Sequence, residues 1–126
     1  MNSMFEGCSS LESLSLNKFK TNKVQIMSRM FKDCSGLKNL EINNFYTTKV
    51  IEMDEMFSNV INLRQLNLSS FNTRNLYSWT GIWNNITELN IIIDVDKNQN
   101  ILENIPDGIN ITDINEYEYY LKLLFN

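Results

Sequence analysis

The sequence predicts an α/β solenoid, a stack of 26-residue strand–turn–helix units with a C-terminal helical cap. Three observations predict this fold: a repeat of constant length, a change of hydrophobic period within each unit, and a change of composition in the last third of the chain. Self-similarity at a fixed period of roughly 20–50 residues is typical of repeat architectures. The 126 residues are enough for one modest domain.

The repeat is visible when the sequence is shifted by 26 residues, because about ten positions in each unit keep their character. Residues 1–89 hold about three full units and one degenerate unit. The clearest columns are Met4, Met30, Met56 and Ile82; Phe5, Phe31, Phe57 and Trp83; Leu14, Leu40 and Leu66; Leu16, Ile42 and Leu68; Thr21, Thr47 and Thr73.

Two hydrophobic periods alternate within a unit. The pairs Leu14-x-Leu16, Leu40-x-Ile42 and Leu66-x-Leu68 have period two, which predicts a short strand with one buried face. A second set has spacings of three and four, which predicts a short helix: Val24, Met27, Met30, Phe31 and Cys34. Thr21, Thr47 and Thr73 precede these helices at the position of an N-cap. We interpret Phe19, Phe45 and Phe71 as a stack of rings between strand and helix.

The segment Leu11-x-x-Leu14-x-Leu16 matches the core of a leucine-rich repeat, so the predicted stack is a leucine-rich repeat stack. The whole pattern, best seen from Met30-Phe31-x-x-Cys34-Ser35-x-Leu37 to Thr47-x-x-Val50-x-x-Met53, resembles the BspA-like leucine-rich repeat of bacterial surface proteins and lipoproteins. The resemblance covers roughly residues 4–83. It implies a non-catalytic binding protein, often an adhesin at a cell surface, and it implies no particular ligand.

The amino-acid composition excludes several classes of function. The chain has no His and only two Cys, so it lacks the commonest acid–base group and a four-ligand zinc set. No carboxylate pair, nucleophile or phosphate loop emerges from the pattern, so we expect no enzyme and no cofactor. Neither part of the chain is basic enough for nucleic-acid binding, and no apolar run is long enough to insert into a membrane.

Residues 90–126 are interpreted as an acidic cap, since they carry 7 acidic and 2 basic residues whereas residues 1–89 carry 8 and 9. Leu89-x-Ile91 with Ile93 predicts a fourth strand, in which Leu89 aligns with Leu66 at an offset shortened to 23 residues. Ile109-x-Ile111 predicts an edge strand. Asp113 and Glu116 resemble a capping box that opens a helix to about Phe125. One side of this helix is expected to be apolar: Ile114, Tyr117, Leu121, Leu124 and Phe125.

The first unit has no comparable cap, because only Met1-Asn2-Ser3 precede its motif. Leu14 and Leu16 would then lie on an unprotected edge strand, which invites pairing with another chain. We therefore expect self-association or partner docking at this face.

The candidate partner site is the strand face, where outward polar residues form columns from one unit to the next. The columns are Ser13, Asn39 and Gln65; Ser15, Glu41 and Asn67; Asn17, Asn43 and Ser69. Glu88 and Asn90 would continue the first two. These mostly uncharged side chains suit hydrogen bonding to a protein, peptide or glycan. The alternative is a solvated strand face without a binding role, which the lack of a large aromatic anchor favours.

Two further candidates are weighed. Cys8 and Cys34 share a repeat position, so they could form a disulfide or remain two free thiols. Val60 occupies the same position in the third unit, which indicates a site for any small apolar residue and favours free thiols. Asp94-x-Asp96-x-Asn98 begins like a calcium loop, but Gln99 and Ile105 occupy the places of the required Gly and Glu, so we expect no metal.

The sequence is compatible with two cellular locations. The resemblance implies a secreted or surface protein. The absence of a signal peptide before Gly7-Cys8 supports an alternative, a cytoplasmic binding protein or inhibitor encoded by a mobile element or pathogen and acting on a host protein.

Overall fold

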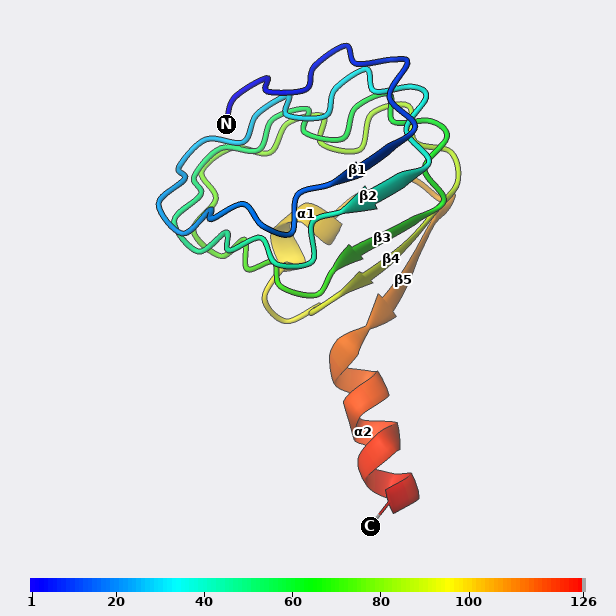
Figure 1. The fold of residues 1–126 in the computed structure, drawn as a ribbon. Helices are drawn as coiled ribbons and strands as arrows, with labels where there is room; N and C mark the ends of the chain where they lie inside the picture. The colour runs from blue at the N-terminus through cyan, green and yellow to red at the C-terminus, as the bar shows by residue number, and fades with distance from the viewer. Residues whose placement is uncertain (126) are drawn as a thin grey trace.

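The computed structural model describes residues 1–125, except for the side chains of residues 117–120. Seven elements follow one another along the chain: β1 (Ser13–Ser15), β2 (Asn39–Glu41), β3 (Gln65–Leu68), β4 (Leu89–Ile93), α1 (Gln99–Leu102), β5 (Ile109–Asp113) and α2 (Ile114–Phe125). The strands lie side by side at one side of the body, and irregular chain returns along the other side (Figure 1).

The strands are parallel and form two sheets, β1–β2 and β3–β4–β5. Ser13 pairs with Asn39, which is the 26-residue offset of the sequence repeat. The offset becomes shorter towards the C-terminus, because Leu66 pairs with Ile91 and Ile91 with Ile111. The predicted alignment of Leu66 with Leu89 is therefore wrong by two residues. The short strands follow from the short period-two runs, whose inward residues Leu40 and Leu66 are buried.

The predicted solenoid of strand–turn–helix units is wrong. The part of the chain that the structure describes contains two helices, α1 and α2, and both follow the repeated units. In place of a helix, each unit has a run of consecutive turns, which we call the turn segments: residues 2–7, 28–33, 54–59 and 80–85. The leucine-rich repeat interpretation required a helix in each unit, so it is wrong as well.

Positive φ angles explain why the turn segments do not become helices. Within each segment two residues four apart have φ between 54° and 76°, for example Glu55 and Asn59 in the third. The left-handed conformation interrupts the hydrogen bonding of a right-handed helix and recurs here at fixed places. The intervening side chains still point inward at spacings of three and four, because each turn closes by a bond such as Met56 N–H to Met53 C=O at 3.3 Å.

Backbone hydrogen bonds join each turn segment to the next. In the third unit the N–H groups of Glu55, Phe57 and Asn59 donate to carbonyls of the fourth unit at 2.9, 3.2 and 2.9 Å. The same alternate positions donate in the first and second units, so all these bonds run in one direction along the stack. These bonds join each turn segment to its neighbour, as the strand pairing joins the strands.

Thr21, Thr47 and Thr73 are not N-caps, since no helix follows them. Each is at least 98% buried and bonds to the next unit instead. The Thr47 hydroxyl donates to the Asn72 carbonyl at 3.0 Å and accepts from the Asn72 N–H at 2.8 Å. Thr21 does the same with Tyr46. A buried hydroxyl with both functions satisfied explains why this residue repeats unchanged.

The core contains one column of stacked rings, but at different residues from those expected. Successive centroids in the column Phe5, Phe31, Phe57 and Trp83 are 5.9, 5.8 and 5.2 Å apart, and the planes are within 14° of parallel. Phe45 and Phe71 are buried but Phe19 is 40% exposed. The ring contacts of the described residues do not include these three, so the predicted stack there is wrong.

The C-terminal end of the core is closed by β5 and α1 rather than by the long helix. Ile101 and Ile109 are buried there, and the indole N–H of Trp83 donates to the Ile101 carbonyl at 2.7 Å. The predicted edge strand at Ile109-x-Ile111 is confirmed. The division of the chain at residues 89 and 90 stays a prediction.

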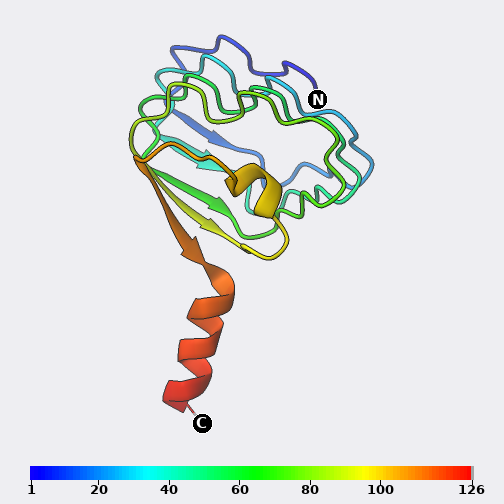
Figure 2. The ribbon, with the colours of Figure 1, turned by 180° about the vertical axis from the view of Figure 1, so that it is seen from behind.

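The predicted helix to Phe125 exists as α2, but it does not cap the stack. It projects from β5 away from the body in both views (Figures 1 and 2). Leu124 and Phe125 are 76% and 82% exposed. The Asp113 carboxylate accepts the Asn115 N–H at 3.1 Å, as an N-cap does. Tyr117, expected on the apolar side, has a side chain outside the described part of the chain.

Candidate functional site

The two sheets separate between β2 and β3. On either side of this position the backbone is paired: the Lys38 N–H donates to Glu12 at 2.8 Å, and the Asn90 N–H donates to Arg64 at 2.9 Å. No backbone hydrogen bond among the described residues joins β2 to β3. The facing edges of β2 and β3 therefore carry polar backbone groups that have no strand partner.

A hollow of about 490 Å³ lies at this separation, which we call the strand-face hollow. β2 and β3 supply most of its wall. Its lining residues are Lys38, Asn39, Leu40, Glu41, Asn43, Arg64, Gln65, Leu66, Asn67 and Ile92. Leu40 and Leu66 are 6% and 2% exposed, so the hollow has an apolar floor and a polar rim.

Five of the nine predicted partner-site residues line the strand-face hollow: Asn39, Glu41, Asn43, Gln65 and Asn67. The other four, Ser13, Ser15, Asn17 and Ser69, lie outside its lining. Ser13 and Ser15 face solvent and pair in register with Asn39 and Glu41, as the columns require.

The predicted columns do not continue correctly into the fourth strand. Gln65 pairs with Asn90 and Asn67 pairs with Ile92, whereas the columns place Glu88 and Asn90 there. The offset at these strands is 25 residues, whereas the predicted columns assumed an offset of 23. Ile92, which the sequence reasoning did not select, is 42% exposed and enters the hollow as an apolar side chain.

Hydrogen bonds hold several of these side chains in place. The Asn17 side-chain amide donates to Glu41 at 3.2 Å, and the Asn67 side-chain oxygen accepts the Ser69 N–H at 2.9 Å. The side-chain oxygen of Asn17 is buried and has no partner among the described residues. The β2 end of the face is therefore partly preorganised, and one buried acceptor without a partner lies beside it.

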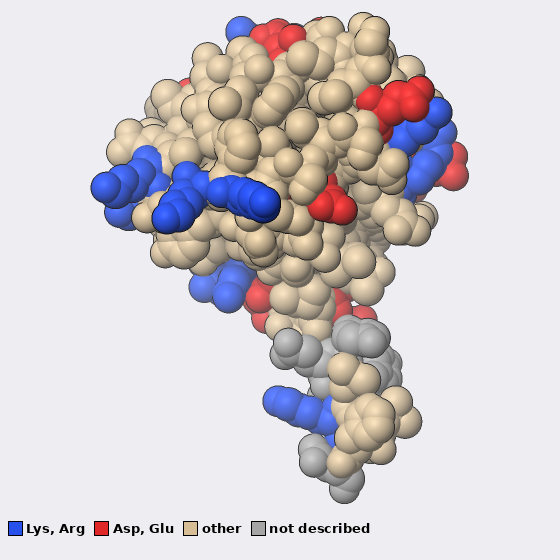
Figure 3. All heavy atoms as spheres, viewed as in Figure 1, with Lys and Arg blue, Asp and Glu red and all other residues tan. Residues whose placement is uncertain are grey.

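Charges at the hollow are mixed. Lys38 lies 3.7 Å from Glu12, and Arg64 lies 3.5 Å from Glu88, with all four side chains at least half exposed. Other basic residues belong to the segments that follow β1 to β4: Lys18, Lys20, Lys49, Arg74 and Lys97. Basic side chains gather at the left edge of Figure 3. The hollow itself has no single sign of charge to select an anion.

The two cysteines are free thiols, with Cys34 buried and Cys8 half-buried. The Cys34 thiol donates to the Phe5 carbonyl at 3.0 Å. Burial raises the pKa of Cys34 from its ordinary 9.0 to about 11, so the group stays a neutral thiol at physiological pH. A buried neutral thiol is a core residue rather than a nucleophile.

The Asp94 loop is built into the fold. Asp94 is 7% exposed, and its carboxylate accepts from the Lys97 backbone and from the Asn115 side chain at 3.3 and 2.9 Å. Across the described residues no group of three His, Cys, Asp or Glu gathers as metal ligands. None of the described helices has the length and apolar character needed to cross a membrane.

Comparison with protein families gives a match over residues 1–114. The chain belongs to the family described as Mycoplasma protein of unknown function, DUF285. The DUF285 match includes all five strands and ends at the first residue of α2, so it covers the whole body and the strand-face hollow. No curated protein and no solved structure gives a significant match.

Proposed function

We propose that this DUF285 chain is a non-catalytic binding module of the BspA-like type that takes a peptide segment of a partner protein on its strand face. The observation that carries the proposal is the strand-face hollow at the separation of β2 from β3. A peptide that lies across the strand face can bond to polar groups of the two strands, while the side chains of the hollow provide selectivity.

The side chains around the hollow support a peptide ligand. Leu40, Leu66 and Ile92 offer apolar contact, and Asn39, Gln65 and Asn67 offer amide donors and acceptors around it. The lining offers a partner to a cation and to an anion of a peptide, because it includes Glu41 of β2 and Arg64, the residue before β3. A surface role in adhesion follows from the BspA-like resemblance and belongs to the same proposal.

The test is selection of a phage-displayed library of random peptides on the immobilised chain, followed by calorimetry of the enriched peptides. Gln65→Trp places a bulky ring in the hollow and should lower their affinity about tenfold or more. Gln25→Trp is the matched control, since Gln25 is also exposed but lies outside the strands, and it should change affinity less than about twofold.

Two results would overturn the proposal. One is a selection that enriches no peptide above an unrelated protein. The other is an equal loss of affinity in both variants, which would place binding elsewhere on the surface. A chain that binds arrayed glycans and no peptide would replace the proposed ligand class.

A further inference from the structure

The last turn segment, residues 80–85, carries a row of backbone N–H donors at the C-terminal end of the stack. In the third unit, the N–H groups of Glu55, Phe57 and Asn59 each donate to the following segment. The equivalent groups of the fourth unit belong to Gly81, Trp83 and Asn85. The described residues provide no hydrogen-bond acceptor for any of these three N–H groups.

The fourth turn segment has the same conformation as the third, so its free N–H groups point onward along the stack. Gly81 and Asn85 have φ of 67° and 63°, close to the values of 54° and 62° at Glu55 and Asn59. The internal turn bonds match as well. Asn84 N–H donates to Gly81 at 3.1 Å, as Ser58 N–H donates to Glu55 at 3.2 Å.

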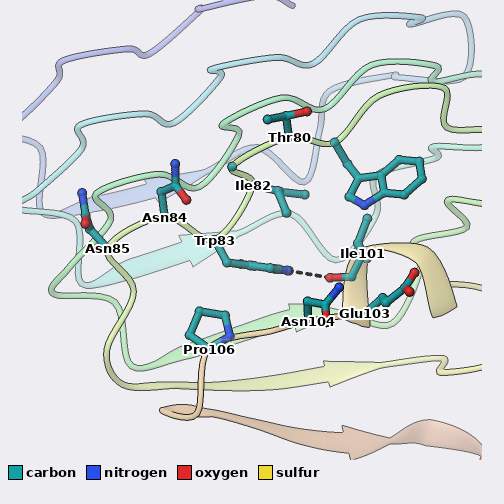
Figure 4. Close-up of a pocket in the computed structure, with 11 residues that line it drawn as sticks. Thr80, Ile82, Trp83, Asn84, Asn85, Ile101, Glu103, Asn104 and Pro106 are labelled. Atoms are coloured by element: carbon teal, nitrogen blue, oxygen red, sulfur yellow. Dashed lines mark hydrogen bonds between the residues drawn. The ribbon is translucent and has the colours of Figure 1, made fainter.

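This donor row borders a groove of about 350 Å³, which we call the end groove. Residues 79–85 form one wall, and Ile101, Glu103, Asn104 and Pro106 form the other (Figure 4). The indole of Trp83 closes the column of stacked rings there, held by its bond to Ile101. Glu103 is the charged residue among those that line the groove, and it is exposed.

We propose that the end groove binds one basic peptide segment of a partner protein. Alternate backbone carbonyls of the segment accept from Gly81, Trp83 and Asn85, as the fourth unit accepts from the third. A Lys or Arg side chain of the segment lies near the exposed carboxylate of Glu103.

A single segment fits this end better than a whole second copy of the chain. On the strand side β5 already pairs with β4, so the next layer is occupied there. On the opposite side the layer after residues 80–85 is open at the donor row. An added segment therefore completes the half of the layer that the chain leaves open, without displacing β5.

The chain itself supplies the probe. Residues 26–34 already act as acceptors in the second unit: carbonyls of Ser28, Met30 and Lys32 accept from the first unit at 2.9, 2.9 and 2.8 Å. This segment also contains two basic residues, Arg29 and Lys32. The test uses the capped synthetic peptide of residues 26–34 carrying Cys34→Ser, added to the full chain.

Amide hydrogen exchange measured by NMR is the decisive readout. In the free chain, the amides of Gly81, Trp83 and Asn85 should exchange much faster than those of Glu55 and Phe57, which are hydrogen-bonded. Saturation with the peptide should slow these three amides about tenfold or more. Equal protection of both rows in the free chain, or bound peptide without slowing, would overturn the proposal.

Charge variants separate the end groove from the strand-face hollow. Glu103→Lys should weaken the peptide about fivefold or more, whereas Glu6→Lys, an equal charge change at an exposed residue of the first unit, should have less than about twofold effect. Gln65→Trp should leave this peptide unaffected. Equal losses in Glu103→Lys and Glu6→Lys, or a loss in Gln65→Trp, would contradict binding at the end groove.

Discussion

Replacing Thr47 with Val removes one hydroxyl group from the bonds that join the second unit to the third and keeps the branched shape of the side chain. Thr47 is fully buried, and its hydroxyl makes two hydrogen bonds to Asn72, at 3.0 Å to the carbonyl and 2.8 Å from the N–H. Each bond contributes about 1 kcal/mol net, and the unpaired Asn72 N–H costs about 1–3 kcal/mol. We therefore expect the free energy of unfolding to fall by about 2–4 kcal/mol.

Urea denaturation followed by circular dichroism measures this loss. Thr48→Val is the matched control: Thr48 is the next residue, is only half-buried, and its hydroxyl has no partner among the described residues. It should change the free energy of unfolding by less than about 0.5 kcal/mol. Amide exchange adds a second measurement, because Thr47→Val should speed exchange at Asn72.

The reasoning would be refuted by a Thr47→Val chain within about 0.5 kcal/mol of the original, or by equal losses in both variants. Faster exchange at Val50 with no change at Asn72 would also refute it, since that pattern belongs to an N-cap of the local segment.

Three further outcomes are expected. Phe57→Ala should lower the free energy of unfolding by about 3–5 kcal/mol, because Phe57 is 1% exposed and stacks on two rings. Phe19→Ala should lower it much less in the same denaturation assay, because Phe19 is 40% exposed. Cys34 should resist a thiol reagent at pH 8 that modifies Cys8, as mass spectrometry would show. The folded state also holds the Cys34 proton up to a pKa of about 11, against an ordinary 9.0. The stability that this group contributes should therefore be complete below about pH 9 and be lost as the pH rises to about 11. Phe125→Ser should leave the free energy of unfolding within about 0.5 kcal/mol, since Phe125 is 82% exposed, and a loss of several kcal/mol would show that α2 packs on the body in solution.

The repeat period and the strands were predictable because side chains report them directly. The pairing of Ser13 with Asn39 follows from the 26-residue shift, and the buried Leu40 and Leu66 follow from period-two alternation. Five of the nine residues chosen for the strand face line a hollow for the same reason, since outward positions of neighbouring strands must lie together.

The helices of the repeat were predicted wrongly because spacing alone does not distinguish a helix from consecutive turns. Both place residues three and four apart on one face. A better signal was present in the column Gly7, Asp33, Asn59 and Asn85, since Gly, Asn and Asp adopt positive φ most easily. A helix would not place such residues at the same point of every unit.

Other features had no signal in the sequence. The separation of β2 from β3 is not marked, because the units on either side of it have the same pattern. The end groove depends on how residues 101–106 cross the last unit, which is a matter of tertiary packing. The exposed α2 follows a sequence pattern that also suits a packed helix, so only the structure shows that it projects.

The 26-residue offset of the repeated units also determines which changes of length this body can accommodate. Ile26 pairs with Glu52, and Glu52 with Ser78, each after 26 residues. Loss of one residue from a strand would exchange its inward and outward side chains. Duplication or loss of a whole unit keeps inward positions inward and outward positions outward, and it changes the distance between the two ends by about one strand spacing, ~4.8 Å. A gene of this kind can therefore lengthen or shorten its product by whole units while both ends keep their chemistry.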